Sequence, residues 1–135
     1  MANIQLLIVD DEERFLLTTR KLLSRKGFDV LTANSGQRAL DMLKAHAIQI
    51  VILDVKMPGM DGLTTLREIK HHYPFMEVIM LTGHATVPSA VEGMQAGASD
   101  YLMKPINMDL LAEKVTEAAV RRRASGERGI WPPPA

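Results

Sequence analysis

Cysteine is missing from this sequence, and so is any long hydrophobic run. Without thiols the chain cannot form disulfides or bind zinc through thiolates. It shows no secretory signal and no apolar stretch near the roughly 18 residues of a membrane span, so we expect a soluble cytoplasmic protein. The formal net charge is +0. A balanced charge gives no electrostatic reason to expect nucleic acid or a membrane as an obligatory partner, and we predict neither.

What the sequence does contain is a regular alternation of two patterns. Apolar segments typical of strands alternate five times with segments of helical periodicity, which predicts a (βα)5 doubly wound parallel sheet. Strands are expected at residues 4–9, 28–33, 49–53, 78–81 and 99–103. Helices are expected at 12–26 and 35–45, after Asp61, at 87–96, and from Asn107 to about 123. With 135 residues, of which 47% are hydrophobic, the chain fits one domain with a single core.

Polar and small residues mark the predicted helix ends. Ser35, Asp61 and Asn107 are expected N-caps, and a turn cluster at 58–62 lets the backbone fold back over the end of the third strand. Residues 124–135 have neither periodicity nor a packable face. We therefore expect a domain at 1–123, followed by a flexible tail or a truncated linker.

Three arginines, Arg121–Arg123, close the last predicted helix. They are open to two interpretations, a contact with nucleic acid or a solvated helix end whose cations complement the helix dipole. We favour the solvated end, because it needs no partner.

Charged residues follow three of the predicted strands at the point where each strand ends. Asp10 and Asp11 follow the first strand, Asp54 follows the third, and Lys104 follows the fifth. Function collects beyond the carboxyl ends of the strands in an open parallel sheet, so we expect one acidic pocket there. Mg²⁺ takes oxygen ligands and shares its coordination sphere with phosphate oxygens. The pocket is therefore expected to bind magnesium.

A phosphoryl group suits this pocket. Asp54 can act as a nucleophile toward phosphorus, as in other covalent mechanisms that use a carboxylate. The ammonium of Lys104 would bind one phosphoryl oxygen as a point charge, and the hydroxyl of Thr82, at the end of the fourth strand, would donate to another.

Together these motifs resemble a known family. Asp10–Asp11, the segment 53–62 around Asp54, the segment 81–84 around Thr82, and the segment 101–105 around Lys104 stand in the order and spacing of the receiver domains of two-component response regulators. The resemblance covers about residues 4–120. It implies the flavodoxin-like strand order 2-1-3-4-5 for the predicted sheet.

The resemblance also implies a role for each pocket residue. Asp54 would accept a phosphoryl group from a sensor histidine kinase or a histidine phosphotransfer protein, and the domain would catalyse its own phosphorylation and dephosphorylation. Asp11, Asp54 and the backbone carbonyl of Lys56 would ligate Mg²⁺, and Asp10 would act mainly through water. Thr82 and Lys104 would bind the phosphate.

The same family implies a conformational switch. Tyr101 resembles the aromatic residue that moves inward when Thr82 shifts, and the Lys104–Pro105 peptide bond is expected to be cis. Lys56 and His84 lie two residues beyond Asp54 and Thr82, at the mouth of the pocket. Either residue can be solvated and inert, and for Lys56 two further alternatives stay open: it screens the acyl phosphate, or it crowds the attacking water.

Two other classes of protein share parts of this pattern. A flavodoxin-like nucleotide binder needs a first loop that cradles phosphate, whereas residues 10–13 are all acidic and repel an anion. A phosphatase of the haloacid dehalogenase type needs a second aspartate two residues after its nucleophile, and that position is Lys56 here.

The output of the switch is the least determined feature of the sequence. We expect it on the face built by the helix at 87–96, the strand at 99–103 and the last helix, where a downstream protein, an attached output domain or a second copy of the phosphorylated chain would bind. The segment 82–87 resembles the corresponding segment of receivers that are attached to transcriptional activators. The chain is thus either a free-standing receiver or the receiver part of a larger regulator.

Overall fold

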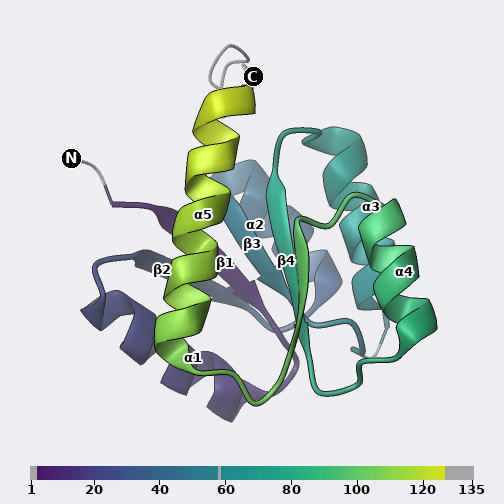
Figure 1. Cartoon of the computed structure of the whole chain (residues 1–135), viewed down its shortest axis with the longest axis horizontal. Helices are drawn as coiled ribbons and strands as arrows, with labels where there is room; N and C mark the ends of the chain where they lie inside the picture. The colour runs from purple at the N-terminus through teal and green to yellow at the C-terminus, as the bar shows by residue number, and fades with distance from the viewer. Residues whose placement is uncertain (1–2, 58, 127–135) are drawn as a thin grey trace.

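The structure is a computed structural model that describes residues 3–57 and 59–126. Strands and helices alternate along the whole described chain (Figure 1). The strands are β1 (Gln5–Val9), β2 (Asp29–Ala33), β3 (Ile50–Leu53), β4 (Glu77–Thr82) and β5 (Asp100–Met103). The helices are α1 (Glu13–Arg25), α2 (Gly36–Ala45), α3 (Gly62–His72), α4 (Val87–Gln95) and α5 (Met108–Gly126).

All five strands pair in parallel in one sheet, in the order β2-β1-β3-β4-β5. This confirms both the predicted fold class and the predicted strand order. The register aligns Val9 of β1 with Leu53 of β3, so the residues that follow these two strands emerge side by side. The chain leaves β1 toward β2 on one side and reaches β3 on the other, which makes the gap between β1 and β3 the topological switch point of the sheet.

Side chains alternate between two hydrophobic layers, one on each face of the sheet. Leu6 and Ile8 of β1 pack in the layer with α1 and α5, while Leu7 and Val9 pack in the layer with α2 and α3. Figure 1 shows α1 and α5 on one face and α2 on the opposite face. Burial on both faces explains why these strands are continuous apolar runs rather than alternating ones.

The observed strand bounds lie within one residue of the predicted ones, and so do those of α1 and α4. The exception is α5, which continues to Gly126 and so includes the first three residues of the expected tail. The turn residue Pro58 and the remaining tail at 127–135 lie outside the described residues. No helix in the described part of the chain is long and apolar enough to cross a membrane.

The predicted caps are present. The side chains of Ser35 and Asp61 accept hydrogen bonds from the third backbone amide that follows each of them, at 3.1 and 2.8 Å. Asn107 accepts two, from Asp109 at 2.7 Å and Leu110 at 3.2 Å. These bonds satisfy amide groups that a helix start otherwise leaves without a partner.

The end of α5 corrects our solvated interpretation of the arginine cluster. Arg121 forms an ion pair with Glu77, the first residue of β4, at 2.9 Å. Arg122 is buried, with 6% of its surface exposed, and burial lowers the pKa of its guanidinium. Arg122 lies on the face of α5 that packs on the sheet, so its position follows from packing and not from the helix dipole alone.

Helix α3 begins in close contact with the end of β3, and this approach requires a glycine. The amide of Gly62 donates to the carbonyl of Val55 at 2.7 Å. A Cβ atom at Gly62 would lie 2.1 Å from the carbonyl oxygen of Asp54 and 2.5 Å from the Cα of Val55. The turn cluster thus holds the backbone of Asp54 against the start of α3.

We predict that Gly62→Ala lowers the free energy of unfolding by about 1–3 kcal/mol, because the methyl group overlaps backbone that cannot rotate away. The matched control is Gly93→Ala inside α4, where a Cβ meets Tyr101 at an ordinary 3.5 Å. That control should keep or raise stability, since alanine favours helix. Urea unfolding of both variants measures the difference, and equal stabilities would contradict the close approach.

Candidate functional site

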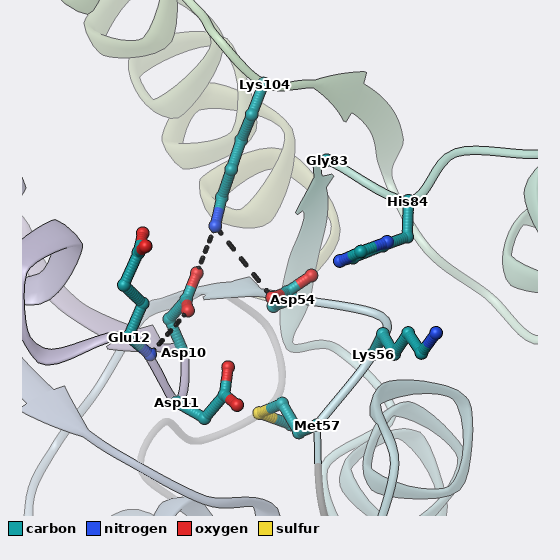
Figure 2. Close-up of a pocket in the computed structure, with 9 residues that line it drawn as sticks. All are labelled: Asp10, Asp11, Glu12, Asp54, Lys56, Met57, Gly83, His84 and Lys104. Carbon is teal, nitrogen blue, oxygen red and sulfur yellow. Dashed lines mark hydrogen bonds and ion pairs between the residues drawn. The ribbon is translucent and has the colours of Figure 1, made fainter.

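The candidate site lies at the topological switch point, just beyond the ends of β1 and β3. Asp10 follows β1 and its amide donates to Ala33 at 3.1 Å, while the amide of Asp54 donates to Val9 at 3.0 Å. These bonds extend the sheet by one residue on each strand and fix both backbones. Figure 2 shows the two carboxyl groups facing the same space.

The space between these strand ends is a pocket of about 610 Å³. All residues predicted to lie at the pocket line it except Thr82. The lining consists of Asp10, Asp11, Glu12, Asp54, Lys56, Met57, Gly83, His84 and Lys104.

Three carboxylates meet in this pocket. Asp10, Asp11 and Asp54 each offer an oxygen within 4.8 Å of the others. Asp10 and Asp54 are buried, with 1% and 5% of their surface exposed, whereas Asp11 is exposed at the rim. The Oδ1 atom of Asp54 is buried and has no hydrogen-bond partner among the described residues. A buried carboxylate oxygen without a donor is costly, so the pocket favours a bound cation or electrophile at this atom.

Lys104 is the cation that faces the acids. Its ammonium lies 2.5 Å from Oδ2 of Asp10 and 3.8 Å from Oδ2 of Asp54. The bond to Asp10 is short and charge-assisted, while the distance to Asp54 exceeds that of a hydrogen bond. Lys104 therefore pairs with Asp10 and leaves Asp54 open on one side (Figure 2). As the family resemblance implied, the Lys104–Pro105 peptide bond is cis.

The pKa of Asp10 is raised above its usual value of 3.8 by burial, even though hydrogen bonds from Lys104 and from the amide of Glu12 stabilise its ionised form. The nearby charge of Asp54 raises this pKa further. Burial therefore raises this pKa by more than the hydrogen bonds and the charge of Lys104 lower it.

Thr82 lies behind the pocket wall. It is fully buried, and its hydroxyl oxygen accepts a hydrogen bond from the amide of His84 at 3.0 Å. Its carbonyl accepts from the amide of Lys104 at 2.9 Å, so the ends of β4 and β5 are joined directly. Because a hydroxyl both donates and accepts, the bond from His84 leaves the proton of Thr82 available for another acceptor.

Lys56 and His84 line the pocket as expected for residues at its mouth. In Figure 2 both lie on the side of Asp54 opposite Lys104. Tyr101 lies outside the pocket, and its hydroxyl shares a hydrogen bond of 2.7 Å with the hydroxyl of Ser89 in the first turn of α4.

Sequence reasoning missed two neighbours of the predicted residues, Ser89 and Phe15. Ser89 joins Tyr101 to the capping box that begins α4, in which it pairs with Thr86. The ring centroid of Phe15 lies 4.0 Å from the ammonium of Lys104. The position of Phe15, four residues after Asp11, was the available signal, because one helical turn brings it back to the strand end.

The donors in this pocket fit magnesium. They are hard carboxylate oxygens from neighbouring strand ends, one of them is buried without a donor, and Asp11 opens the group to solvent. Mg²⁺ binds through one or two carboxylates and keeps several waters, which requires such a partly open site.

A five-stranded doubly wound sheet with an acidic, lysine-containing pocket at its switch point defines the receiver class of signalling domains. The chain belongs to this family, because the model of the response regulator receiver domain matches residues 6–116. It is therefore a receiver domain of two-component signal transduction.

Individual relatives and solved structures belong to the same family. The transcriptional regulatory protein ZraR of Escherichia coli is 39% identical over 116 residues, which cover 86% of this chain but 26% of that protein. Among solved structures, a CheY-like receiver domain protein from Methanospirillum hungatei JF-1 has a TM-score of 0.88 at 31% identity and covers 92% of this chain and 99% of its own. The receiver domain of NtrX from Brucella abortus has a TM-score of 0.80 at 33% identity, covering 85% and 98%. The chain thus spans about a quarter of the length of the curated relative.

The raised pKa of Asp10 predicts a pH-dependent gain in stability for Asp10→Asn. Between pH 3.8 and its raised pKa, Asp10 keeps its proton when folded but loses it when unfolded, so stability from this group falls as pH rises through that window. At pH 7 without metal, Asp10→Asn should raise the free energy of unfolding, and the gain should shrink toward pH 4.

Urea unfolding in EDTA at both pH values measures this gain. Asp41→Asn on the exposed face of α2 is the control and should stay within about 0.5 kcal/mol of wild type. A loss of stability in Asp10→Asn at pH 7 would show that the bond to Lys104 outweighs the burial of the charge.

Proposed function

We propose that Asp54 is the phosphoacceptor of this receiver domain and that its phosphorylation changes the face formed by α4, β5 and α5. The observation that carries the proposal is the Asp54 carboxylate, which is buried at the switch point and whose Oδ1 has no donor among the described residues. The ammonium of Lys104 is hydrogen-bonded to Asp10 but lies 3.8 Å from Asp54, which is too far for a hydrogen bond.

The donor is a phosphohistidine on a sensor histidine kinase or a histidine phosphotransfer protein. A carboxylate oxygen of Asp54 attacks phosphorus, the phosphorus–nitrogen bond breaks, and the electron pair of that bond leaves with the imidazole, which takes up a proton from water. The product is an acyl phosphate on Asp54. Hydrolysis by water later restores the carboxylate and releases inorganic phosphate.

Asp11, Asp54 and the carbonyl of Lys56 would hold Mg²⁺, with Asp10 acting through a water molecule. When bound, the ion neutralises charge on the phosphoryl oxygens. Three carboxylates meet in the pocket, and Lys104 supplies one positive charge against them, which supports their role in binding a further cation.

Lys104 and Thr82 link the phosphate to the rest of the domain. Lys104 can exchange its bond with Asp10 for one with a phosphoryl oxygen, since its ammonium already lies 3.8 Å from Asp54. Thr82 can donate its hydroxyl proton to another oxygen once β4 moves toward the pocket. Tyr101 would then leave Ser89 and turn inward, which releases the first turn of α4. Lys56 and His84, at the mouth, would set how readily water reaches the acyl phosphate.

The proposed output face carries apolar side chains that no described residue covers. On α4 the exposed fractions are 77% for Val87, 51% for Val91 and 48% for Met94. Met103 at the end of β5 and Leu110 on α5 are exposed at 64% and 41%. A cluster of exposed apolar residues of this kind is typical of a surface that binds protein. A downstream protein, an attached domain or a second copy of the chain would bind there.

The relatives favour an attached output domain as the second form of this proposal. ZraR is named a transcriptional regulatory protein, and this chain matches 26% of it. Intact mass of the protein from its native cells, compared with 15.0 kDa, decides between a larger regulator and a free-standing receiver. A cytoplasmic location remains a prediction.

We predict that acetyl phosphate with Mg²⁺ adds one phosphoryl group to the wild-type protein and none to Asp54→Asn, because the amide is a poor nucleophile. EDTA should abolish the addition. Intact-mass spectrometry measures it, and Asp41→Asn is the control that should react as wild type. Labelling that persists in Asp54→Asn or in EDTA would refute the assignment.

We predict that beryllofluoride, a phosphoryl mimic, changes backbone hydrogen exchange mainly at residues 82–105 and in α5, beyond the pocket itself. A ligand shifts a two-state equilibrium only through elements with which it interacts differently in the two states, and Thr82 and Lys104 belong to β4 and the end of β5. Asp54→Asn should show no change. Changes confined to α1 and α2 would place the output on the other side of the domain.

A further inference from the structure

Lys104 has a second partner besides the acids, and it is an aromatic ring. The ammonium lies 4.0 Å from the centroid of Phe15, a distance at which a cation is attracted to the face of the ring. The same ammonium is 2.5 Å from Asp10. It is therefore held from two sides, by a carboxylate of β1 and by a ring of α1.

The ring has packing contacts besides Lys104. Phe15 is partly buried and packs against the hydrophobic layer between the sheet and α1 and α5, where Ile106 and Met108 also pack. Packing against a buried layer restricts the rotamers of a side chain. The ring is thus more restricted than the lysine stem, which has four rotatable bonds.

Lys104 lines a second hollow of about 400 Å³ as well as the acidic pocket. The hollow is mostly apolar and is lined by Phe15, Thr18, Thr19, Lys104, Pro105, Ile106 and Met108. Phe15 thus lies where the two spaces meet at Lys104. Its ring contacts the ammonium at the position that is 3.8 Å from Asp54, so this contact favours that position of the lysine over others that its stem can reach.

We propose that Phe15 is a positioning residue, which holds the Lys104 ammonium beside Asp54 while its hydrogen-bond partner changes from Asp10 to a phosphoryl oxygen. The ring suits this task because it attracts the cation without taking up one of its strong hydrogen bonds. A second carboxylate would instead compete with the phosphate. This inference rests on the proposed function, since it presumes a phosphoryl group on Asp54.

The test compares Phe15→Leu, which keeps apolar volume and removes the ring, with Phe15→Tyr, which keeps the ring. The ε-methylene protons of Lys104 should show an upfield ring-current shift by NMR in wild type and Phe15→Tyr, and lose it in Phe15→Leu. With Mg²⁺ present, beryllofluoride should bind about twofold to fivefold more weakly to Phe15→Leu than to wild type. Leu17→Ala, on the same helix with 60% exposure, is the control and should bind as wild type.

A double-mutant cycle separates positioning from packing. In a Lys104→Ala background, Phe15→Leu should have no further effect on beryllofluoride binding, because the ring then has no cation to hold. An equal weakening in that background would show that Phe15 only supports the fold, and the inference would be wrong. An unshifted Lys104 signal in wild type would overturn it as well. Wild type that binds no beryllofluoride would reject the phosphoacceptor assignment, and the role of Phe15 with it.

Discussion

The crowding of three carboxylates at one end of the sheet is the constraint on which the site depends. The parallel register of β1 and β3 brings Asp10 and Asp54 together whatever their charge, and Asp11 follows. The ammonium of Lys104 opposes their mutual repulsion. The pKa of Asp10 is nevertheless raised, mainly because burial removes its carboxylate from water. The hydrophobic layers on both faces of the sheet stabilise the fold enough to offset this repulsion. A pocket that remains short of positive charge is suited to take up a cation and, with it, a phosphoryl group.

Sequence reasoning succeeded where a local rule acts alone. Strands buried on both faces are readable as apolar runs, caps such as Ser35 and Asp61 have a fixed offset to their helices, and the residues at the strand ends follow from both. It failed where the outcome depends on which side of an element faces the core. The burial of Arg122 depends on how the last helix packs on the sheet, and Phe15 meets Lys104 across 89 residues of sequence. The spacing of Phe15 from Asp11 places it near the strand end but does not identify Lys104 as its partner. Spacing likewise does not identify Ser89 as the partner of Tyr101.

The pocket is joined to two different parts of the domain by bonds of different kinds. The backbone bond from Lys104 to Thr82 joins the end of β5 to the end of β4, so the two residues proposed to bind phosphate are connected directly. The hydroxyl bond between Tyr101 and Ser89 ties β5 to the start of α4, and a bond between two neutral side chains is easily exchanged for water. The backbone bond thus lies beside the pocket, and the more easily exchanged side-chain bond lies at the start of α4. Under the proposed function, a movement of β4 at the pocket would break the bond of Tyr101 to Ser89 while the bond between β4 and β5 is kept.

Helix α5 is long enough for a small tilt near the pocket to become a larger displacement at its far end. It begins four residues after Lys104 and ends beyond Arg121. The partner of Arg121 is Glu77, the first residue of β4, which lies at the end of the strands opposite the pocket. Its 19 residues make a rod of about 28 Å at 1.5 Å per residue. A tilt of about 5° at the pocket end would then displace the far end by roughly 2 Å if the rod turned rigidly. The Arg121–Glu77 pair lies close to that far end, so it acts as a tether that limits the swing. This ion pair acts together with the buried Arg122 and the core residues of the helix, so the far end of α5 is held to the sheet by both charge and packing.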